Sequence, residues 1–547
     1  MSNQSNKLRI AIVGLGPRGL GAIEALRVAA IKKGTQLEMH LFDPEAWPGV
    51  GPNYSPDQTS NCILNLPTRA IQITPDQRLQ LGIGNFDEWV GGDCDPDEFP
   101  TRARLGEYFA DRFRRSTACA SEDDFKHYRL GVTRAIKSDS GWQLEAGEQS
   151  FGPFDEVLLT QGQPLTAPDP QLRRWRPHAE ARSATLISAY PDKDLLHAAQ
   201  SWAGHSVGVR GLGLSTFDVL RVLTLGLGGS FQNGTYQPSG REPGRILPFS
   251  LDGQAPLPKP IDAQLDARFD PTVAEADRFL NVARRSLSGD TKAARAALFD
   301  SLITPSVRIM NEFGVGVDAK AIATWLASEW DDPGVQETKS PVEALRSNTE
   351  IARGDAPPSI EFTIGQIWRK WQDDLRRVFG ETEVSRDIAD ATIGFDEGLK
   401  RVSYGPPLRS AEELLALVDC GIVCLSMADD PDVLLTSNGW QLKDDDDTTQ
   451  VSVMVDAVLP SPTLEAMLDP LMVSLRDAGL VSAVDEDLGV RILPDGLAID
   501  AKGQPVRGLS VFGRMTLGSS IGVDSIHDCF GDAPRRWADG VMKRHVT

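Results

Sequence analysis

The sequence predicts an α/β protein in which two parallel-sheet domains are joined to a mainly helical insertion. Three observations support this prediction. A strand, a glycine-rich turn and a helix follow one another at the N-terminus, and the same order returns after His205. From about Arg268 to Arg377 the pattern changes to amphipathic helical stretches such as AEADRFLNVARRSL. Because alternating strands and helices build parallel sheets, we expect two sheet domains and one helical region.

The first unit runs from the strand LRIAIV through a helix to the strand LEMHLF. Its turn, GLGPRG at residues 14–19, has glycines where a tight turn, close approach to a pyrophosphate and helix packing each need one. The helix N-terminus adds N–H donors for an anion. A nucleotide site is predicted here, against the alternative of a packing turn. Its residues would be Gly14, Gly16, Pro17, Arg18, Gly19 and Asp43, whose carboxylate ends the second strand and would bind ribose hydroxyls.

The second unit has the turn GLGLST at residues 211–216, which lacks the third glycine. Its second strand is expected near GSFQNGTYQPSGR, which ends with Arg241 and no acidic residue. An arginine can pair with a 2′-phosphate, so this reading favours NADPH over NADH. The alternative is that Arg241 is an ordinary surface side chain. The predicted contacts are Gly211, Gly213, Ser215, Thr216 and Arg241.

Two dinucleotide turns in one chain suggest hydride transfer from a nicotinamide to a flavin. The turn at Gly513-Arg514 is expected to begin the last helix and to direct its N-terminus at the flavin. The strand VLLTQGQP ends in Gly162 and leads out of the first domain. The expected domains are an FAD-binding domain at 1–165 and 441–547, an NAD(P)H-binding domain at 166–255, and a mainly helical insertion at 256–440.

Composition narrows the choice of partners. The 547 residues include 56 basic and 77 acidic side chains, and the net charge of −21 repels nucleic acid and anionic membranes. The six cysteines form no Cys-x-x-Cys pair, and the seven histidines form no His-x-x-x-His pair, so no protein metal site is expected. We therefore expect a cytoplasmic protein with a small-molecule substrate; homo-oligomerisation stays open.

Several segments, in order along the chain, resemble one family. The chain is similar to the two-dinucleotide-binding flavoproteins, and specifically to flavin-dependent N-hydroxylating monooxygenases such as those acting on aspartate in nitrosuccinate pathways. The segments that carry the resemblance are IAIVGLGPRGL, NLPTRAIQI, NFDEWV, FPTRARLGEYF, VLLTQGQP, GLGLSTFDVL, YQPSGREP and VFGRMTLG.

The resemblance implies two Rossmann-like domains, one for FAD and one for NADPH. It assigns FAD to the first turn and NADPH to the second. It places Asn65, Leu66 and Thr68 near the flavin ring, and Gly513, Arg514 and Thr516 at its far edge. Reduced FAD would react with dioxygen, and the flavin hydroperoxide would oxygenate a small nucleophile, by N-hydroxylation of an amine or amino acid. No catalytic side chain is identified.

The chain departs from the family after SGREP. A Ser-Arg-x-Gly segment is usual there, whereas this chain has Leu251 in place of the arginine, with Asp252 beside it. Since an arginine would suit a substrate carboxylate, its absence argues against aspartate or any other dianion. The candidates for substrate recognition are Asp252, Arg369 and Arg409. Two rival readings stay open: a flavin oxidoreductase or oxidase without oxygen insertion, and a non-catalytic nucleotide sensor.

Overall fold

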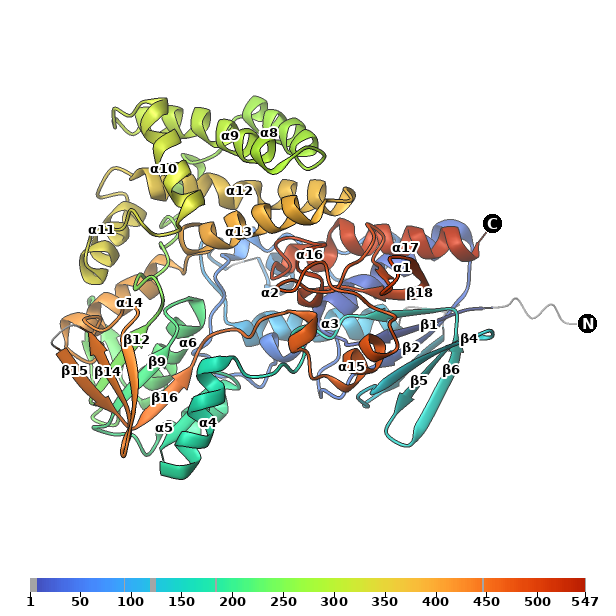
Figure 1. The fold of residues 1–547 in the computed structure, drawn as a ribbon, viewed down its shortest axis with the longest axis horizontal. Coiled ribbons are helices and arrows are strands. Elements are labelled where there is room, and N and C mark those ends of the chain that lie inside the picture. Colours follow the sequence, from blue (N-terminus) through green and yellow to red (C-terminus); the bar gives the residue numbers. More distant parts are fainter. Residues whose placement is uncertain (1–6, 93, 119–123, 183, 445–446, 547) are drawn as a thin grey trace, which may run out of the picture.

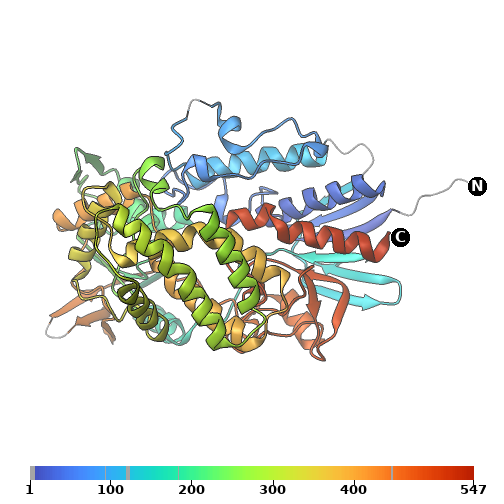
Figure 2. The same cartoon turned by 90° about the horizontal axis from the view of Figure 1, so that it is seen from above.

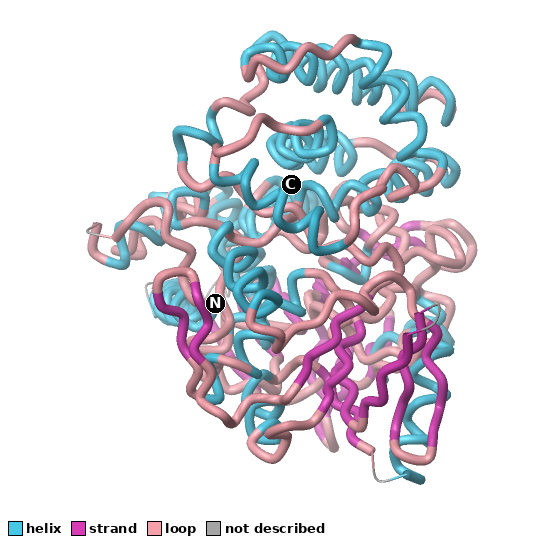
Figure 3. The backbone as a smooth tube through the Cα atoms, turned by 90° about the vertical axis from the view of Figure 1, so that its left-hand side faces the viewer, coloured by secondary structure: helices cyan, strands magenta, loops and turns pink. Residues whose placement is uncertain are grey.

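The computed structural model describes residues 7–92, 94–118, 124–182, 184–444 and 447–546. Figure 1 shows three parts: a sheet domain that holds both ends of the chain, a second sheet domain, and a group of helices above them. Figure 3 shows these helices as a layer above the magenta strands of the two sheet domains. The predicted α/β fold with two parallel-sheet domains and a helical insertion is confirmed.

The first domain is built on a six-stranded sheet with the order β17-β18-β7-β1-β2-β3, parallel except for β17. The strands are β1 (Leu8–Val13), β2 (Leu37–Phe42), β3 (Asp124–Tyr128), β7 (Glu156–Leu159), β17 (Leu497–Ile499) and β18 (Pro505–Val511). Strands β1, β2 and β7 are buried almost throughout, as expected for a sheet covered on both faces.

Helix α1 (Pro17–Lys33) follows β1 directly. Pro17 occupies its first turn, two lysines lie in its last turn, and Gly34 ends it in the left-handed conformation. The helix packs against the C-terminal helices α16 (Ile526–Phe530) and α17 (Asp532–His545). The remaining elements of this domain are α2 (Phe86–Val90), α3 (Arg102–Ala118), α15 (Pro470–Asp477) and the antiparallel strands β4 (Arg134–Ser138), β5 (Gly141–Ala146) and β6 (Gln149–Phe154).

The second domain has a four-stranded parallel sheet with the order β12-β9-β16-β8. Its parallel strands are β8 (Thr185–Ser188), β9 (Ser206–Arg210), β12 (Arg245–Phe249) and β16 (Val453–Asp456). Around them lie α4 (Pro170–Arg182), α5 (Asp192–Ala199), α6 (Leu214–Leu223), the hairpin β10 (Ser230–Gln232) and β11 (Thr235–Gln237), α14 (Leu408–Asp419), and the antiparallel strands β13 (Asp432–Thr436), β14 (Gly439–Asp444) and β15 (Asp447–Val451).

This topology corrects one expected boundary. The segment 441–456 was assigned to the FAD-binding domain, but β16 pairs with β8 and β9 in the centre of the second sheet. The chain returns to the first domain only after β16. There the two crossing segments lie side by side, joined by the bridge between Thr166 and Met467. Helix α14, expected in the insertion, also packs into the core of the second domain through Ala411 and Leu414.

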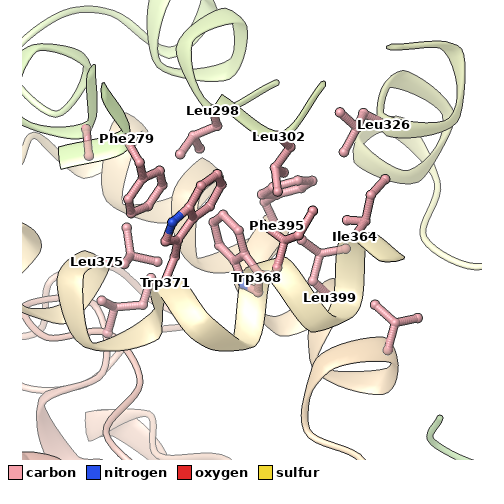
Figure 4. Close-up of a cluster of buried hydrophobic side chains, with 14 of the residues drawn as sticks. Phe279, Leu298, Leu302, Leu326, Ile364, Trp368, Trp371, Leu375, Phe395 and Leu399 are labelled. Carbon is pink, nitrogen blue, oxygen red and sulfur yellow. The ribbon is translucent and has the colours of Figure 1, made fainter. Parts of the chain in front are cut away.

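The insertion consists of α7 (Ala263–Ala267), α8 (Val273–Ser286), α9 (Thr291–Glu312), α10 (Ala319–Asp331), α11 (Pro341–Arg353), α12 (Ile360–Glu381) and α13 (Arg386–Ser403). Viewed from above, its green and yellow helices lie over the second domain and reach the red C-terminal segment (Figure 2). Trp371 of α12 stacks on Phe279 of α8 with 4.4 Å between ring centroids, in a core shared by α8, α9, α12 and α13 (Figure 4). This core is independent of both sheets.

The two sheet domains are tied together by ion pairs and hydrogen bonds to helix α6. Arg102 of α3 pairs with the buried Asp218 of α6 at 2.7 Å. Arg221, one turn further along α6, donates from Nε to the carbonyl oxygen of Asn61 at 2.9 Å. Thr59 donates to Asp192 at the start of α5. The loop that precedes residues 65–68 is therefore held directly against α6.

Candidate dinucleotide and substrate site

The first glycine turn is shaped partly by packing. Gly14 has φ of +96°, and a Cβ there would lie 2.6 Å from the carbonyl carbon of Thr160. A Cβ on Gly19 would lie 2.3 Å from the carbonyl oxygen of Gly14. Side chains at both positions would clash with the protein itself, so these two glycines let α1 and β7 approach the turn.

Gly16 differs, because a Cβ there would make only an ordinary van der Waals contact. The nearest atom that its Cβ would meet is the Cα of Gly51, at 3.7 Å. Gly51 in turn has φ of +68° and faces the Cα of Gly16. The two glycines leave a cradle at the N-terminus of α1 that side chains would fill, and Pro17 in the first turn removes no N–H that the helix itself uses. This cradle fits a pyrophosphate group.

Asp43, the residue predicted to bind the ribose, is buried at the end of β2. Its Oδ2 accepts from the backbone N–H of Leu15 inside the turn, and its Oδ1 accepts from Glu45 at 2.8 Å. Each oxygen retains a second lone pair for a ribose hydroxyl. Nearby, the buried Oε1 of Gln161 has no hydrogen-bond partner among the described residues, and the Gln161 backbone flanks Gly14. The residues present therefore fit the adenosine and pyrophosphate part of FAD.

Arg18, whose contact with the nucleotide stays a prediction, lies in the first turn of α1, and its Nε is 3.0 Å from the Cβ position of Gly513. Its guanidinium pairs with Asp528 and donates to the carbonyl oxygen of Val523 at 2.9 Å. Arg18 thus joins α1 to the C-terminal segment.

The residues expected at the flavin ring lie on two neighbouring segments. Thr68 is buried and donates through Oγ1 to the carbonyl oxygen of Glu98. Leu66 packs against the hydrophobic core of the first domain, and Asn65 is half-buried. Gly162 and Gly513 follow the parallel neighbours β7 and β18 at the carboxyl edge that also holds the first turn. Arg514 crosses between them, donating to Gln163 at 2.6 Å and pairing with Asp524 at 2.9 Å.

The expectation of a last helix beginning at Gly513 is wrong. Residues Arg514–Thr516 form only a short 3-10 turn, in which Thr516 donates to the carbonyl oxygen of Gly513. The last helix, α17, begins at Asp532 and packs along α1.

The second turn resembles the first in its construction. Gly211 has φ of +113°, and its N–H donates to the carbonyl oxygen of Phe249 at 2.8 Å. Gly213 caps the N-terminus of α6, and apart from its chain neighbours no atom of the described residues lies within 4 Å of its Cβ position. Thr216 is turned inward and donates to the carbonyl oxygen of Gly211 at 2.7 Å, and Ser215 lies beside it in the first turn of α6. The open N-terminus of α6 fits a second pyrophosphate.

Arg241 does not belong to this site. The segment near GSFQNGTYQ forms the separate hairpin β10–β11 and does not enter the parallel sheet. Arg241 is exposed and packs over Gly228, and its neighbour Glu242 accepts through its carbonyl oxygen from Gly204, just before β9 begins. Arg241 therefore lies near the amino end of β9, whereas Gly211 follows the carboxyl end of this strand.

We expect Arg241→Ala to leave the ratio of Kd values for NADP⁺ and NAD⁺ unchanged, because the guanidinium lies at the opposite end of β9 from the turn. Equilibrium titration of the FAD-loaded variant with each dinucleotide measures this ratio. A selective loss of NADP⁺ affinity would contradict the placement.

A cluster of charged side chains joins residues 65–69, called the flavin-side segment after the contacts predicted there, to the insertion. In this cluster Asp266 is buried, whereas Arg69, Arg369 and Lys370 are partly exposed. Asp266 at the end of α7 pairs with Arg369 and with Lys370, at 3.4 Å, both from α12. It also pairs with Arg69, which directly follows Thr68, at 3.3 Å. Burial alone raises the pKa of Asp266, but the nearby Arg369 and Lys370 charges bring it below its ordinary value. The carboxylate is therefore ionised at neutral pH.

Lys259 completes this cluster and was missed by the sequence analysis. Its side chain is buried, and among the described residues its ammonium donates one hydrogen bond, to the carbonyl oxygen of Gly405 at 2.8 Å. Burial, with the repulsion of Arg369 second, holds the pKa of Lys259 well below its ordinary value. Once protonated, Nζ would have two further N–H donors without a partner among the described residues. No sequence motif marks this lysine.

The three substrate candidates separate clearly. Arg369 lies in the charge cluster. Arg409 is on the exposed face of α14, where it pairs with Glu413 one turn away, so it is not brought to the site. Asp252 follows β12 and lies near Gly334 of the insertion, not in the charge cluster.

The residues that the structure describes contain neither a candidate metal site nor a helix that could span a membrane. No group of histidine, cysteine or acidic side chains there could hold a metal ion. None of the helices in this part of the chain has the length and apolar character needed to cross a membrane.

Two parallel-sheet domains, each with a glycine turn opening onto a helix N-terminus, define the class of two-dinucleotide-binding proteins. Residues 11–164 match the family described as FAD-NAD(P)-binding. This match confirms the prediction of FAD together with a nicotinamide dinucleotide, and it does not distinguish NAD from NADP. The backbone is similar over 99% of this chain to the reduced form of ornithine hydroxylase (PvdA) from Pseudomonas aeruginosa, with a TM-score of 0.52 and 10% identity, covering 100% of that chain.

Sequence relatives extend the comparison to most of the chain. Nitrosuccinic acid synthase npaA of Aspergillus oryzae is 26% identical over 86% of this chain and 81% of its own length. An L-aspartate N-monooxygenase (nitrosuccinate-forming) of Streptomyces davaonensis is 25% identical over 90% and 88%. The resemblance to flavin-dependent N-hydroxylating monooxygenases is confirmed.

Proposed function

We propose that this protein is an FAD-dependent, NAD(P)H-using monooxygenase that N-hydroxylates a small amino acid with a side-chain carboxylate, with L-aspartate as its first candidate. The observation that carries the substrate class is the cluster of Arg69, Lys259 and Arg369. It lies between the segment next to the flavin and the insertion, and Lys259 retains donors that no described residue uses. Two relatives are named for L-aspartate.

The position of Leu251 removes an objection to such a substrate. From the sequence alone, the missing arginine is a lost partner for a substrate carboxylate. In the structure Leu251 follows β12 and is 85% exposed, away from the charge cluster. The cations that we propose for the substrate carboxylate are those of this cluster.

The residues of the site would act through binding and exclusion of water. Lys259 and Arg369 would hold a carboxylate by charge-assisted hydrogen bonds and so orient the amine. The insertion core above them would keep water away. In this low-dielectric setting the pKa of the substrate amine falls, which favours the neutral form whose lone pair accepts oxygen. Bound FAD supplies, after reduction by the nicotinamide, the activated oxygen that the amine takes up.

The test is product formation by the FAD-loaded protein with a nicotinamide dinucleotide and oxygen, in the presence of L-aspartate, L-asparagine or L-ornithine. We expect an N-oxygenated product from L-aspartate, with weaker turnover of L-asparagine and none of L-ornithine. Release of hydrogen peroxide equal to the dinucleotide consumed, with every amino acid unchanged, would show a flavin oxidase instead. Turnover of L-ornithine alone would refute the carboxylate assignment.

A further inference from the structure

The segment that follows α13 holds Lys259 in place. The Nζ of Lys259 donates to the carbonyl oxygen of Gly405 at 2.8 Å, and its backbone N–H donates to the carbonyl oxygen of Pro406 at 3.0 Å. Two residues earlier, the N–H of Leu257 donates to the carbonyl oxygen of Arg401 at 3.1 Å. A Cβ at Gly405 would lie 1.5 Å from the carbonyl oxygen of Leu257, so the two backbones are in close contact. The lysine proposed to bind the substrate carboxylate is therefore fixed to the end of this helix.

The same end of α13 is fixed within the insertion. Arg401, in the last turn of the helix, pairs with Glu329 of α10 at 2.8 Å and with Glu361 of α12 at 3.1 Å. Tyr404, the residue that caps the helix, donates from its hydroxyl to Gln372 of α12 at 3.2 Å. The end of α13, α10 and α12 therefore form one unit, and a contact from this end to another domain positions all three.

Charged side chains join this helix end to the first domain. Lys400 donates from Nζ to Oδ2 of Asp524 at 3.3 Å, and Nη1 of Arg514 donates to Oδ1 of the same carboxylate at 2.9 Å. Lys400 also pairs with Glu397 of its own helix. Burial raises the pKa of Asp524, but the charges of Lys400 and Arg514 bring it below its ordinary value, so the carboxylate is ionised at neutral pH.

The strength of this contact comes from sharing and partial burial. An isolated exposed ion pair contributes little to stability, whereas several charges in a network contribute more. Here two cations share one carboxylate, and the side chains of Lys400, Asp524 and Arg514 are between 18% and 36% exposed.

Arg514 lies where the three parts of the molecule meet. It belongs to residues 513–516, called the flavin-edge turn after the contacts predicted there. Its Nε donates to Gln163 at 2.6 Å, on the segment that leaves the first domain. Its Nη2 donates to the carbonyl oxygen of Pro460 at 3.3 Å, on the segment that returns from the second domain. Through Asp524 it also contacts the insertion. One turn thus connects the insertion and both crossing segments.

We propose that Lys400, Asp524 and Arg514 form a positioning chain that sets the distance between the carboxylate anchor at Lys259 and the flavin-edge turn. At a fixed distance, the nitrogen of the bound amino acid reaches the flavin only when the amino acid has the matching length. We expect L-aspartate to be preferred to L-glutamate, which is longer by one methylene, by at least about tenfold. This inference rests on the proposed function, which supplies a substrate carboxylate at Lys259 and a flavin at the turn.

The experiment compares the FAD-loaded native protein with Asp524→Asn, which keeps the shape of the side chain and removes its charge. We expect the Kd for succinate to change less than about twofold, because Lys259 and Arg369 are untouched. The yield of N-oxygenated L-aspartate per dinucleotide oxidised should fall at least about fivefold, with hydrogen peroxide making up the difference, and the preference over L-glutamate should shrink. Glu312→Gln, which breaks the exposed pair with Arg308 in α9, is the matched control and should change none of these values.

Hydrogen exchange without any ligand tests the chain separately from the reaction. Amide exchange of residues 400–406 should be about fivefold faster in Asp524→Asn than in the native protein. An unchanged exchange rate would overturn the proposal, whatever the protein oxygenates. So would an unchanged yield, or a loss of succinate affinity as large as the loss of yield. If exchange responds as expected but the native protein oxygenates no amino acid, the proposed function fails and the chain stands.

Discussion

Gly16→Val is expected to give a folded protein that purifies without the yellow colour of bound FAD. The valine side chain would enter the cradle between Gly16 and Gly51, where the nearest atom to the Cβ position is the Cα of Gly51 at 3.7 Å. Its Cβ would make an ordinary van der Waals contact, whereas a Cβ at Gly14 or Gly19 would clash. We therefore expect loss of FAD with little loss of fold, measured by the flavin absorbance per protein and by circular dichroism.

The matched control is Gly213→Val, at the corresponding position of the second turn. Gly213 also lies at a helix N-terminus, and apart from its chain neighbours no atom of the described residues lies within 4 Å of its Cβ position. This variant should retain full FAD absorbance but lose bleaching by reduced dinucleotide under nitrogen. Stoichiometric FAD in Gly16→Val, or loss of FAD in Gly213→Val, would show that the two turns have been assigned to the wrong cofactors.

Lys259→Met is expected to weaken binding of an amino-dicarboxylate while leaving the fold as stable as before or more so. Losing the charged partner of a buried carboxylate costs at least about 2 kcal/mol, or about 30-fold in affinity. The free protein, by contrast, would no longer bury the polar Nζ of Lys259, whose one hydrogen bond among the described residues goes to Gly405. If Lys259 had only a structural role, Lys259→Met would instead lower the Tm and leave the KM for the amino-dicarboxylate unchanged.

The depressed pKa of Lys259 gives a second signature of the same role. Because burial favours the neutral amine in the free protein, an arriving carboxylate raises this pKa and proton uptake accompanies binding. Succinate is the appropriate probe, since it has two carboxylates and no amine of its own to lose a proton. Calorimetry in buffers of different ionisation enthalpy should show uptake in the native protein and none in Lys259→Met. Equal proton uptake by both proteins would exclude Lys259 as the carboxylate partner.

The sequence predicted the two glycine turns well, because each is a local signal confined to a strand, a turn and a helix. Gly14, Gly16 and Asp43 are brought together by β1 and β2 as expected. Local sequence signals gave a wrong prediction for the next strand of the second unit. The stretch near Tyr236 has strand propensity, but it forms a hairpin, and the true partner of β9 is RILPF at 245–249. Strand propensity cannot tell which strand joins which sheet, so Arg241 was misplaced with it.

The substrate cluster lay beyond sequence reasoning for a different reason. Arg69, Lys259, Asp266 and Arg369 come from three separated parts of the chain, and no spacing relates them. Only the docking of α7 and α12 against the flavin-side segment brings these residues together. The hydrophobic period of α12 predicted a helix but not which neighbours its polar side chains would meet. A buried lysine in the segment PLPKPID is likewise visible only once its surroundings are known.

The contacts of α6 with the first domain have a consequence for electron transfer. Helix α6 carries the second turn at its N-terminus, and Arg102, Asp218 and the Arg221 contact to Asn61 fasten it to the loop preceding the flavin-side segment. If the two turns hold FAD and a nicotinamide dinucleotide as proposed, these short cross-links would help to fix the distance between the two cofactors, while the paired segments around Thr166 and Met467 carry the chain across. Changes to the cross-links would then alter the rate of flavin reduction more than the affinity for the dinucleotide.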